Sequence, residues 1–264
     1  MTIAILGVGV MGEIILGGLL ASGTEPSDIR VTTRRPKRQV RLAEQYGVTV
    51  TSNAEAVVGA DTVLISVKPQ DVTDILAEIS PALAPDALVV SVAAGVKTSS
   101  IEAGLPAGHV VVRVMPNTPA SVDEGMAAIS GGKNATREHL DRVSDILTAV
   151  GQVMIVPEKY QDAVTAISGS GPAYVMFVVE AMIDAGVLLG LPRATATELV
   201  IQTVFGAAKL LRDTGEHPTI LRENVTSPGG TTTRAMRAFE DHRVKAAFMD
   251  ALEAAALRSE ELGS

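Results

Sequence analysis

The stretch Thr2-Ile3-Ala4-Ile5-Leu6-Gly7-Val8-Gly9-Val10-Met11-Gly12 decides the fold of this chain. A short apolar run, residues 2–6, leads directly into the pattern G-x-G-x-x-G, and a helical pattern over residues 13–22 follows. In such a strand–turn–helix unit the first glycine permits a tight turn, the second lets a pyrophosphate approach the backbone, and the third lets helix and strand lie close together. The stretch therefore predicts a dinucleotide-binding turn formed by Gly7, Val8, Gly9, Val10, Met11 and Gly12.

Short apolar runs alternate with helical patterns through the first part of the chain. The runs cover residues 2–6, 29–33, 48–50, 62–67, 88–93, 110–115, 126–130 and 153–156. Several are unbroken stretches of Val, Ile and Leu, which is typical of strands covered on both faces of a parallel sheet. Helical patterns lie between them, for example over 37–46, 71–80 and 136–150. The alternation predicts an α/β fold, with a Rossmann-type doubly wound sheet in a dinucleotide-binding domain over residues 1–157.

Beyond Pro157 the pattern becomes helical throughout. Helices are predicted over 172–189, 194–213, 219–224, 232–240 and 244–261. The first of these is apolar around most of its circumference, so it must be buried on nearly all sides. A small helical domain cannot bury it alone, and a second copy of the chain is the expected cover. We therefore predict an all-helical C-terminal domain over residues 158–264 that binds substrate and forms an obligate homodimer, with any higher oligomer left open.

Composition excludes several classes of protein. The net charge of −8 argues against a nucleic-acid binder, and the absence of cysteine excludes disulfides and thiolate metal sites. The four histidines are scattered without metal-ligand spacing, so no metal site is expected. The chain opens on a buried strand rather than a signal peptide, and Glu180, Asp184 and two glycines interrupt the apolar stretch 174–191. We expect a cytoplasmic protein that binds neither nucleic acid nor membrane.

The second strand indicates which dinucleotide binds. An NAD enzyme usually carries Asp or Glu about 20 residues beyond the glycines, to bind the ribose 2′-hydroxyl. Here that place reads Thr32-Thr33-Arg34-Arg35, without an acid. Hydroxyl and guanidinium groups suit a 2′-phosphate, which Arg can bind through two hydrogen bonds. We predict NADPH as the cofactor, with NADH as a second option; the alternative is a solvated basic turn.

Two further strand ends face the same crevice, since ligands of doubly wound sheets bind outside the carboxyl ends of the strands. Val67-Lys68-Pro69 ends the fourth predicted strand, and Ala93-Ala94-Gly95 follows the fifth. Small residues there leave room for a nicotinamide ring. Either segment alone could also be an ordinary turn between a strand and a helix.

The loop Thr226-Ser227-Pro228-Gly229-Gly230-Thr231-Thr232 precedes a predicted helix and has the composition of an anion site. Backbone N–H groups at a helix N-terminus bind small anions such as a carboxylate.

The chain has no Ser/His/Asp order, no H-E-x-x-H and no Walker sequence. Reduction of a ketone requires a proton donor, whereas an imine nitrogen can arrive protonated, so a hydroxyl such as that of Thr232 would suffice.

Together these motifs resemble those of the pyrroline-5-carboxylate reductases. Besides the glycine turn and the two strand ends, the resemblance rests on Met115-Pro116-Asn117-Thr118-Pro119, Ser168-Gly169-Ser170-Gly171-Pro172-Ala173-Tyr174 and the loop at 226–232. It extends over essentially the whole chain, in order and spacing. The resemblance implies hydride transfer from NAD(P)H to the C=N bond of 1-pyrroline-5-carboxylate, which gives L-proline in the last step of proline biosynthesis.

The resemblance also implies roles for individual residues. On the cofactor side, beyond the glycine turn, it implicates Thr33, Arg34, Arg35, Asn53, Val67, Lys68, Pro69, Ala93 and Ala94. On the substrate side it implicates Asn117, Val225, Ser227, Gly230, Thr231 and Thr232. Thr232 is the implied catalytic residue, because it would reach the ring nitrogen as well as the carboxylate. In this family the loop is often supplied across a dimer seam of intertwined helices.

Two alternative functions remain open at this point. One is a β-hydroxyacid-dehydrogenase-like oxidoreductase, a family that relies on a catalytic Lys in its first all-helical stretch. Residues 172–191 contain no Lys, which disfavours this alternative. The other is a non-catalytic NADP-binding regulatory protein, against which the intact loop at 226–232 argues.

Overall fold

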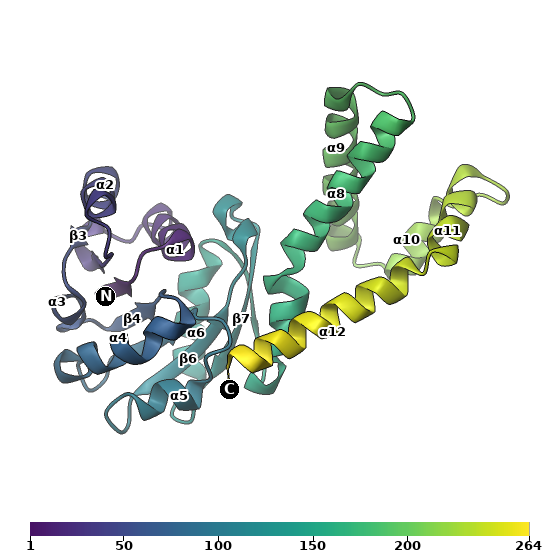
Figure 1. The fold of residues 1–264 in the computed structure, drawn as a ribbon. Coiled ribbons are helices and arrows are strands. Elements are labelled where there is room, and N and C mark those ends of the chain that lie inside the picture. The colour runs from purple at the N-terminus through teal and green to yellow at the C-terminus, as the bar shows by residue number, and fades with distance from the viewer. Residues whose placement is uncertain (264) are drawn as a thin grey trace. The chain divides into compact units, whose positions relative to one another are not determined.

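The computed structural model describes residues 1–263, which form two compact units (Figure 1). The first unit comprises Met1–Ser170 together with the chain from Ala254 onward, and the second comprises Gly171–Glu253. Residue 264, the last of the predicted C-terminal domain, lies outside the described residues.

An eight-stranded sheet forms the centre of the first unit, in the order β3-β2-β1-β4-β5-β6-β7-β8. The strands are β1 (Ile3–Leu6), β2 (Ile29–Val31), β3 (Thr49–Val50), β4 (Thr62–Ile65), β5 (Leu88–Ser91), β6 (Val110–Met115), β7 (Gly125–Gly131) and β8 (Gly151–Ile155). Each of them falls within or overlaps one of the apolar runs. The order reverses between β1 and β4, which is the crevice in which doubly wound sheets bind dinucleotides.

One strand pair departs from the parallel arrangement that the apolar runs suggest. β6 and β7 are antiparallel, with Met115 opposite Ala128, whereas every other neighbouring pair of this sheet is parallel. The connection between them contains only a short 3-10 segment, η4 (Thr118–Val122). A parallel pair needs a crossover of a dozen or more residues, usually a helix, so this short connection returns the chain in the opposite direction.

The helices of the first unit include α1 (Val10–Ala21), α2 (Pro36–Tyr46), α4 (Val72–Ile79) and α6 (Arg137–Thr148), all at predicted positions. Two short helices, α3 (Asn53–Val57) and α5 (Thr98–Ala103), were not predicted because neither is long enough to show helical periodicity. A signal for α3 was nevertheless present. Ser52 and Glu55 form a capping box, the S-x-x-E pattern that marks a helix N-terminus.

Alternate residues of β1 enter two separate cores, one on each face of the sheet. Ile3 and Ile5 belong to the core that includes Ile15 and Leu16 of α1. Ala4 and Leu6 belong to the other core, under α3, α4 and α5. Successive strand side chains point to opposite faces, and both faces are covered here, which explains why the strand is apolar at every position.

The segment between Pro157 and Gly171 belongs to the first unit. It contains η5 (Glu158–Tyr160), α7 (Gln161–Val164) and a π-helical turn, η6 (Thr165–Gly169). Gln161 is fully buried there and donates from Nε2 to Ser130 Oγ of β7 at 2.8 Å. This hydrogen bond attaches the segment to the sheet even though the sequence pattern has already become helical.

The second unit is helical throughout. Its helices are α8 (Gly171–Leu188), α9 (Arg193–Thr214), α10 (Pro218–Asn224), α11 (Thr231–Asp241) and the first part of α12 (Val244–Leu262). α8 carries large apolar side chains that are exposed to solvent in the single chain, including Phe177 at 71% and Leu188 at 88% exposure. By length and hydropathy alone, the helical stretch Glu158–Leu188 could cross a membrane, a test that apolar helices of soluble proteins also pass.

Candidate cofactor and substrate sites

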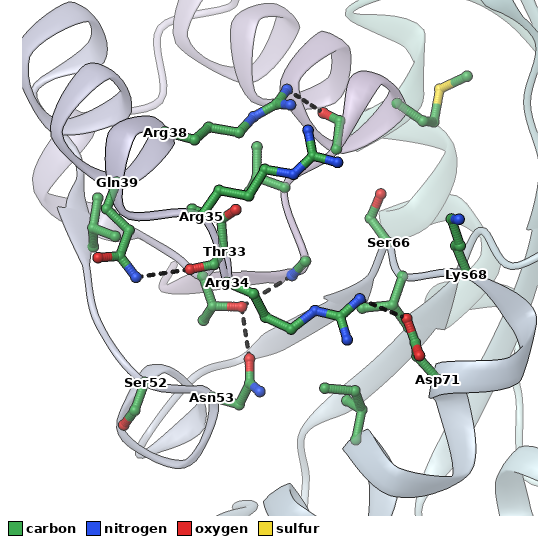
Figure 2. A pocket seen from close by; sticks show the side chains of 18 of the residues that line it. Thr33, Arg34, Arg35, Arg38, Gln39, Ser52, Asn53, Ser66, Lys68 and Asp71 are labelled. Atoms are coloured by element: carbon green, nitrogen blue, oxygen red, sulfur yellow. Dashed lines mark hydrogen bonds and ion pairs between the residues drawn. The ribbon is translucent and has the colours of Figure 1, made fainter.

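A pocket of about 1090 Å³ lies at the carboxyl ends of β1 to β5 (Figure 2). Its volume suits a small-molecule site. Eleven of the residues implicated in cofactor binding line it: Gly7, Val8, Gly9, Val10, Met11, Thr33, Arg34, Arg35, Asn53, Val67 and Lys68. The tertiary structure thus brings together residues from the ends of four strands.

The glycine turn has the geometry that a pyrophosphate requires. Gly7 has φ +78°, and a Cβ there would lie 2.2 Å from Val67 Cγ1, so no other residue fits. Gly9 is the N-cap of α1 and provides no side-chain cap, which leaves N–H groups of the first turn available for an anion. Gly12 lies outside the pocket wall, where a Cβ would lie 3.0 Å from Ser66 Oγ, so it permits close contact of α1 with the loop after β4.

A chain of hydrogen bonds connects this turn to the ends of β2 and β3 and to α4. The Gly7 N–H donates to Thr32 Oγ1 at 2.9 Å, and the Thr32 hydroxyl donates to Asn53 Oδ1 at 2.6 Å. Asn53 Nδ2 in turn donates to Glu78 Oε2 at 2.8 Å. Thr32 is buried, so its hydroxyl positions the turn. In the sequence Thr32 stands beside the residues predicted to bind the 2′-phosphate, and nothing local indicates this role.

Charges of opposite sign line the two sides of the pocket. Three arginines follow β2, and three carboxylates, those of Asp71, Asp74 and Glu78, lie on the α4 side. Arg34 reaches across to Asp71, with Nη2 2.9 Å from Oδ2 (Figure 2). The arginine side is suited to a phosphate, because guanidinium groups bind phosphate oxygens in pairs.

Two residues of the arginine side were not predicted from the sequence. Arg38 lines the pocket, donates to the Gly9 carbonyl at 3.0 Å and pairs with Glu13 of α1. Gln39 donates from Nε2 to the Thr33 carbonyl at 2.8 Å. The signal for Arg38 was its place in the basic cluster Arg34-Arg35-Pro36-Lys37-Arg38, where it lies in the first turn of α2.

The carboxylate of Glu13 joins α1 to α2. The hydrogen bond from Arg41 lowers the pKa of Glu13 to about 2, helped by hydrogen bonds from Arg38 and Tyr46 and opposed by partial burial. Glu13 is therefore ionised at neutral pH. Its charge holds Arg38 beside the glycine turn.

Three other residues implicated in cofactor binding lie outside the wall of this pocket. Pro69 begins the 3-10 segment η2 (Pro69–Asp71). Ala93 is buried behind the end of β5, and Ala94 follows it in the loop. Val92, which directly precedes them, does line the pocket. The loop after β5 therefore starts at the pocket edge.

Asn117 follows β6 and is nearly buried. Its Nδ2 donates to the Ser168 carbonyl at 3.1 Å, and its Oδ1 accepts from the Met126 N–H at 2.8 Å. Asn117 therefore connects β7 with the π-helical turn η6. It does not line the pocket.

The remaining substrate residues lie in the second unit, around the start of α11. Gly230 is the N-cap of α11, and no side chain caps this helix. The Gly230 N–H donates to the Ser227 carbonyl at 3.0 Å, and Thr233 Oγ1 donates to the same carbonyl at 2.7 Å. A turn closed in this way, with Gly229 at φ +69°, leaves N–H groups of the first turn of α11 available to an anion.

Three of the four histidines have structural partners. His109 lies buried between the carbonyls of Pro106 and Ala84, at 2.9 and 3.1 Å. His139 is the capping-box partner of Thr136, and His217 accepts the Thr219 N–H. Within residues 1–263, no group of three or more His, Asp or Glu side chains could hold a metal ion.

The doubly wound sheet, the glycine turn and the arginine-lined pocket define an NADP-binding oxidoreductase. Residues 2–95 match the family described as NADP oxidoreductase coenzyme F420-dependent. Residues 158–262 match the family described as pyrroline-5-carboxylate reductase dimerisation, which begins directly after Pro157.

Relatives match over nearly the full length. A pyrroline-5-carboxylate reductase of Corynebacterium melassecola is 45% identical, covering 99% of this chain and 98% of that protein. One of Synechocystis is 44% identical, covering 99% and 98%. The solved structure of a pyrroline-5-carboxylate reductase from Coxiella burnetii has a TM-score of 0.93 at 36% identity, covering 100% of this chain and 98% of that one. The chain belongs to the pyrroline-5-carboxylate reductase family.

One structure of the family was solved with the cofactor. The Plasmodium falciparum pyrroline carboxylate reductase, with NADP bound, has a TM-score of 0.90 at 30% identity, covering 100% of this chain and 98% of that one. The prediction of NADPH as the cofactor is confirmed at the level of the family.

Proposed function

We propose that this protein reduces the C=N bond of 1-pyrroline-5-carboxylate to give L-proline, with NADPH as the cofactor and NADH as a second option. The uncapped N-terminus of α11, with its closed Ser227–Gly230 turn, is the observation that carries the substrate assignment. A helix start of this kind is suited to the carboxylate of a cyclic imino acid. Membership of the reductase family supports the same reaction.

The pocket residues fit the cofactor. The close approach at Gly7, where any side chain would collide with Val67, leaves the backbone bare for the pyrophosphate. Arg34 and Arg35 would bind the 2′-phosphate, with Thr33 and Asn53 on the adenosine side and the remaining residues of the glycine turn on the pyrophosphate. Val67, Lys68, Pro69, Ala93 and Ala94 would border the nicotinamide. NADPH, when bound, supplies the hydride.

On the substrate side, the loop at 226–232 performs two tasks. The loop holds the carboxylate beside Val225 through Ser227, Gly230, Thr231 and Thr232, and the contact of Thr231 is its backbone N–H. Thr232 also places its hydroxyl at the ring nitrogen. The substrate nitrogen is basic enough to arrive protonated, so the residues orient it and need not supply a strong acid. Asn117 positions the η6 turn near the reacting centre through its bond to Ser168.

We also propose a homodimer through the C-terminal helices, within the domain 158–264, and a location in the cytoplasm. The exposed apolar face of α8 supports the dimer, because an area of this kind marks an interaction surface. A match to a dimerisation family over the same residues supports it as well.

The loss of NADPH absorbance on addition of 1-pyrroline-5-carboxylate tests the proposed reaction, with NADH run in parallel. We expect oxidation with both cofactors and a higher kcat/KM for NADPH. If neither cofactor is oxidised while the protein is folded and dimeric, the reductase assignment is wrong, and a non-catalytic NADP-binding protein becomes the better description.

A further inference from the structure

We propose that the last turn of α12 positions the loop of residues 93–97, which follows β5, and that Ser259 and Gly263 are positioning residues for hydride transfer. The inference rests on the proposed function in one respect, namely that this loop borders the nicotinamide. Its structural part concerns contacts within the first unit alone.

The end of α12 touches the loop backbone to backbone. Gly95 has φ +79°, and a Cβ there would lie 3.2 Å from Gly263 N and 3.3 Å from Leu262 Cβ. A Cβ on Gly263 would lie only 2.1 Å from the Gly95 carbonyl oxygen. Neither position has room for a side chain, so a shift of either backbone moves the other.

Ser259 anchors this end of the helix in the first unit. It is 4% exposed, the one buried residue among the described part of α12. Its hydroxyl donates to Asp162 Oδ1 of α7 at 2.7 Å. The hydroxyl therefore attaches the helix to a segment that is itself attached to β7.

Asp162, the partner of Ser259, is also connected to the C-terminal end of the loop. Arg113 of β6, 3% exposed, lies between two carboxylates, with Nη2 3.6 Å from Asp162 Oδ1 and Nη1 3.5 Å from Glu158 Oε1. Glu158 accepts from both the N–H and the hydroxyl of Thr98, each at 2.7 Å. Thr98 is the residue directly after the loop.

The loop is thus held at three places: by β5 before it, by Gly263 at Gly95, and by Glu158 at Thr98. Two of these three restraints depend on the cluster of Arg113, Asp162 and Glu158. Arg113 is buried, whereas the two carboxylates are half-buried. The cluster keeps its geometry only while Arg113 retains both partners, since an unpaired buried charge is costly. Arg113 Nη2 already lacks a hydrogen bond, so the loss of the Ser259 hydroxyl would leave Asp162 free to shift toward it.

This arrangement bears on catalysis because Val92, next to the loop, lines the cofactor pocket. A displacement of the loop would change the place of the nicotinamide relative to the substrate without removing any contact to the adenosine half. A misplacement of about 1 Å can cost about a hundredfold in rate. The expected signature is therefore a lower kcat with unchanged NADPH affinity.

Four variants of the full chain test the proposal. Ser259→Ala removes the anchor, Ser259→Thr restores the hydroxyl, and Gly263→Ala inserts a methyl group against Gly95. Glu260→Ala is the matched control, because Glu260 is exposed on the same turn.

Two measurements compare these variants. The first needs no cofactor and is the amide hydrogen exchange of residues 93–98 in the apoprotein. The second is kcat, with the primary isotope effect of deuterated NADPH, beside the Kd of NADPH.

We expect exchange in 93–98 to quicken about tenfold in Ser259→Ala and Gly263→Ala, as for a locally opened segment, and to stay unchanged in the other two variants. We expect kcat to fall about tenfold in the same two variants, with a larger isotope effect and an NADPH Kd within about twofold of the original. Unchanged exchange and unchanged kcat in Ser259→Ala and Gly263→Ala would overturn the proposal. A fall in kcat that merely follows the fraction of folded or dimeric protein would overturn it as well. Failure of the proposed function is distinguishable, since the unsubstituted protein would then be inactive.

Discussion

Arg34 and Asp71 face each other across the cofactor pocket, with Arg34 Nη2 2.9 Å from Asp71 Oδ2. The Arg34 side chain is 85% exposed, so this ion pair contributes little to stability and holds the guanidinium weakly. Arg34 can therefore turn its donors to a 2′-phosphate at small cost.

Cofactor preference follows from this geometry. Replacement of Arg34 with Ala should lower the affinity for NADPH about tenfold, because a hydrogen bond to a charged group contributes about 1.5–3 kcal/mol to binding. NADH lacks the 2′-phosphate and should lose less than about twofold in affinity. Fluorescence titration of both cofactors measures the difference. Lys37→Ala is the control, since Lys37 belongs to the same basic cluster but does not line the pocket. Equal losses for both cofactors would show that Arg34 does not bind the 2′-phosphate.

The glycine turn should depend on the hydroxyl of Thr32. Thr32→Val leaves the Gly7 N–H and Asn53 Oδ1 without their partner, which should lower the free energy of unfolding by about 1–3 kcal/mol. The affinities for NADPH and NADH should fall by the same factor, because the turn is proposed to bind the pyrophosphate that both cofactors share. Urea unfolding and cofactor titration measure these two effects. Thr32→Ser keeps the hydroxyl and should behave like the original protein; a loss confined to NADPH would instead place Thr32 at the 2′-phosphate.

Turnover should depend on the Thr232 hydroxyl. Thr232→Ala should lower kcat about ten- to a hundredfold, since orientation of the ring nitrogen is lost, while NADPH affinity stays within about twofold. Thr231→Ala is the matched control from the same turn, because the expected contact of Thr231 is its backbone N–H. Steady-state kinetics and NADPH titration separate the two. A collapse of NADPH binding in Thr232→Ala would assign Thr232 to the cofactor site or to folding.

The stability of the first unit should depend on the ionisation of Glu13. Its pKa in the folded protein is about 2, below the ordinary value of 4.5 that the unfolded chain retains. The stabilisation is therefore fully present above about pH 4.5 and is lost as the pH falls toward 2. Glu13→Gln should lower the free energy of unfolding by about 1–3 kcal/mol at pH 7. Denaturant unfolding of both proteins from pH 7 to pH 2.5 should show the difference shrinking; a constant difference would mean that the charge of Glu13 is unimportant.

Much of the fold could be predicted because its signals are local. Continuous apolar runs mark strands with both faces covered, and the alternation of Ile3, Ala4, Ile5 and Leu6 between two cores confirms the reason. The glycine turn could also be predicted from the sequence, because the left-handed conformation of Gly7 depends only on that residue and its immediate neighbours. The antiparallel β6–β7 pair was missed, because pairing direction depends on the length and conformation of a connection rather than on the strands.

By itself, the sequence determined the eight strands, the main helices, the glycine turn after β1 and the glycine-containing loop before α11, since each is encoded within a short segment. Only the tertiary structure decided that Thr32 supports Gly7, that Arg38 reaches the Gly9 carbonyl, and that Ser259 meets Asp162 from the far end of the chain. These contacts join residues whose separation along the chain carries no periodic signal. They form because the strand order and the closure of the two cores bring their backbones within hydrogen-bond distance, and no local preference of either partner specifies that approach.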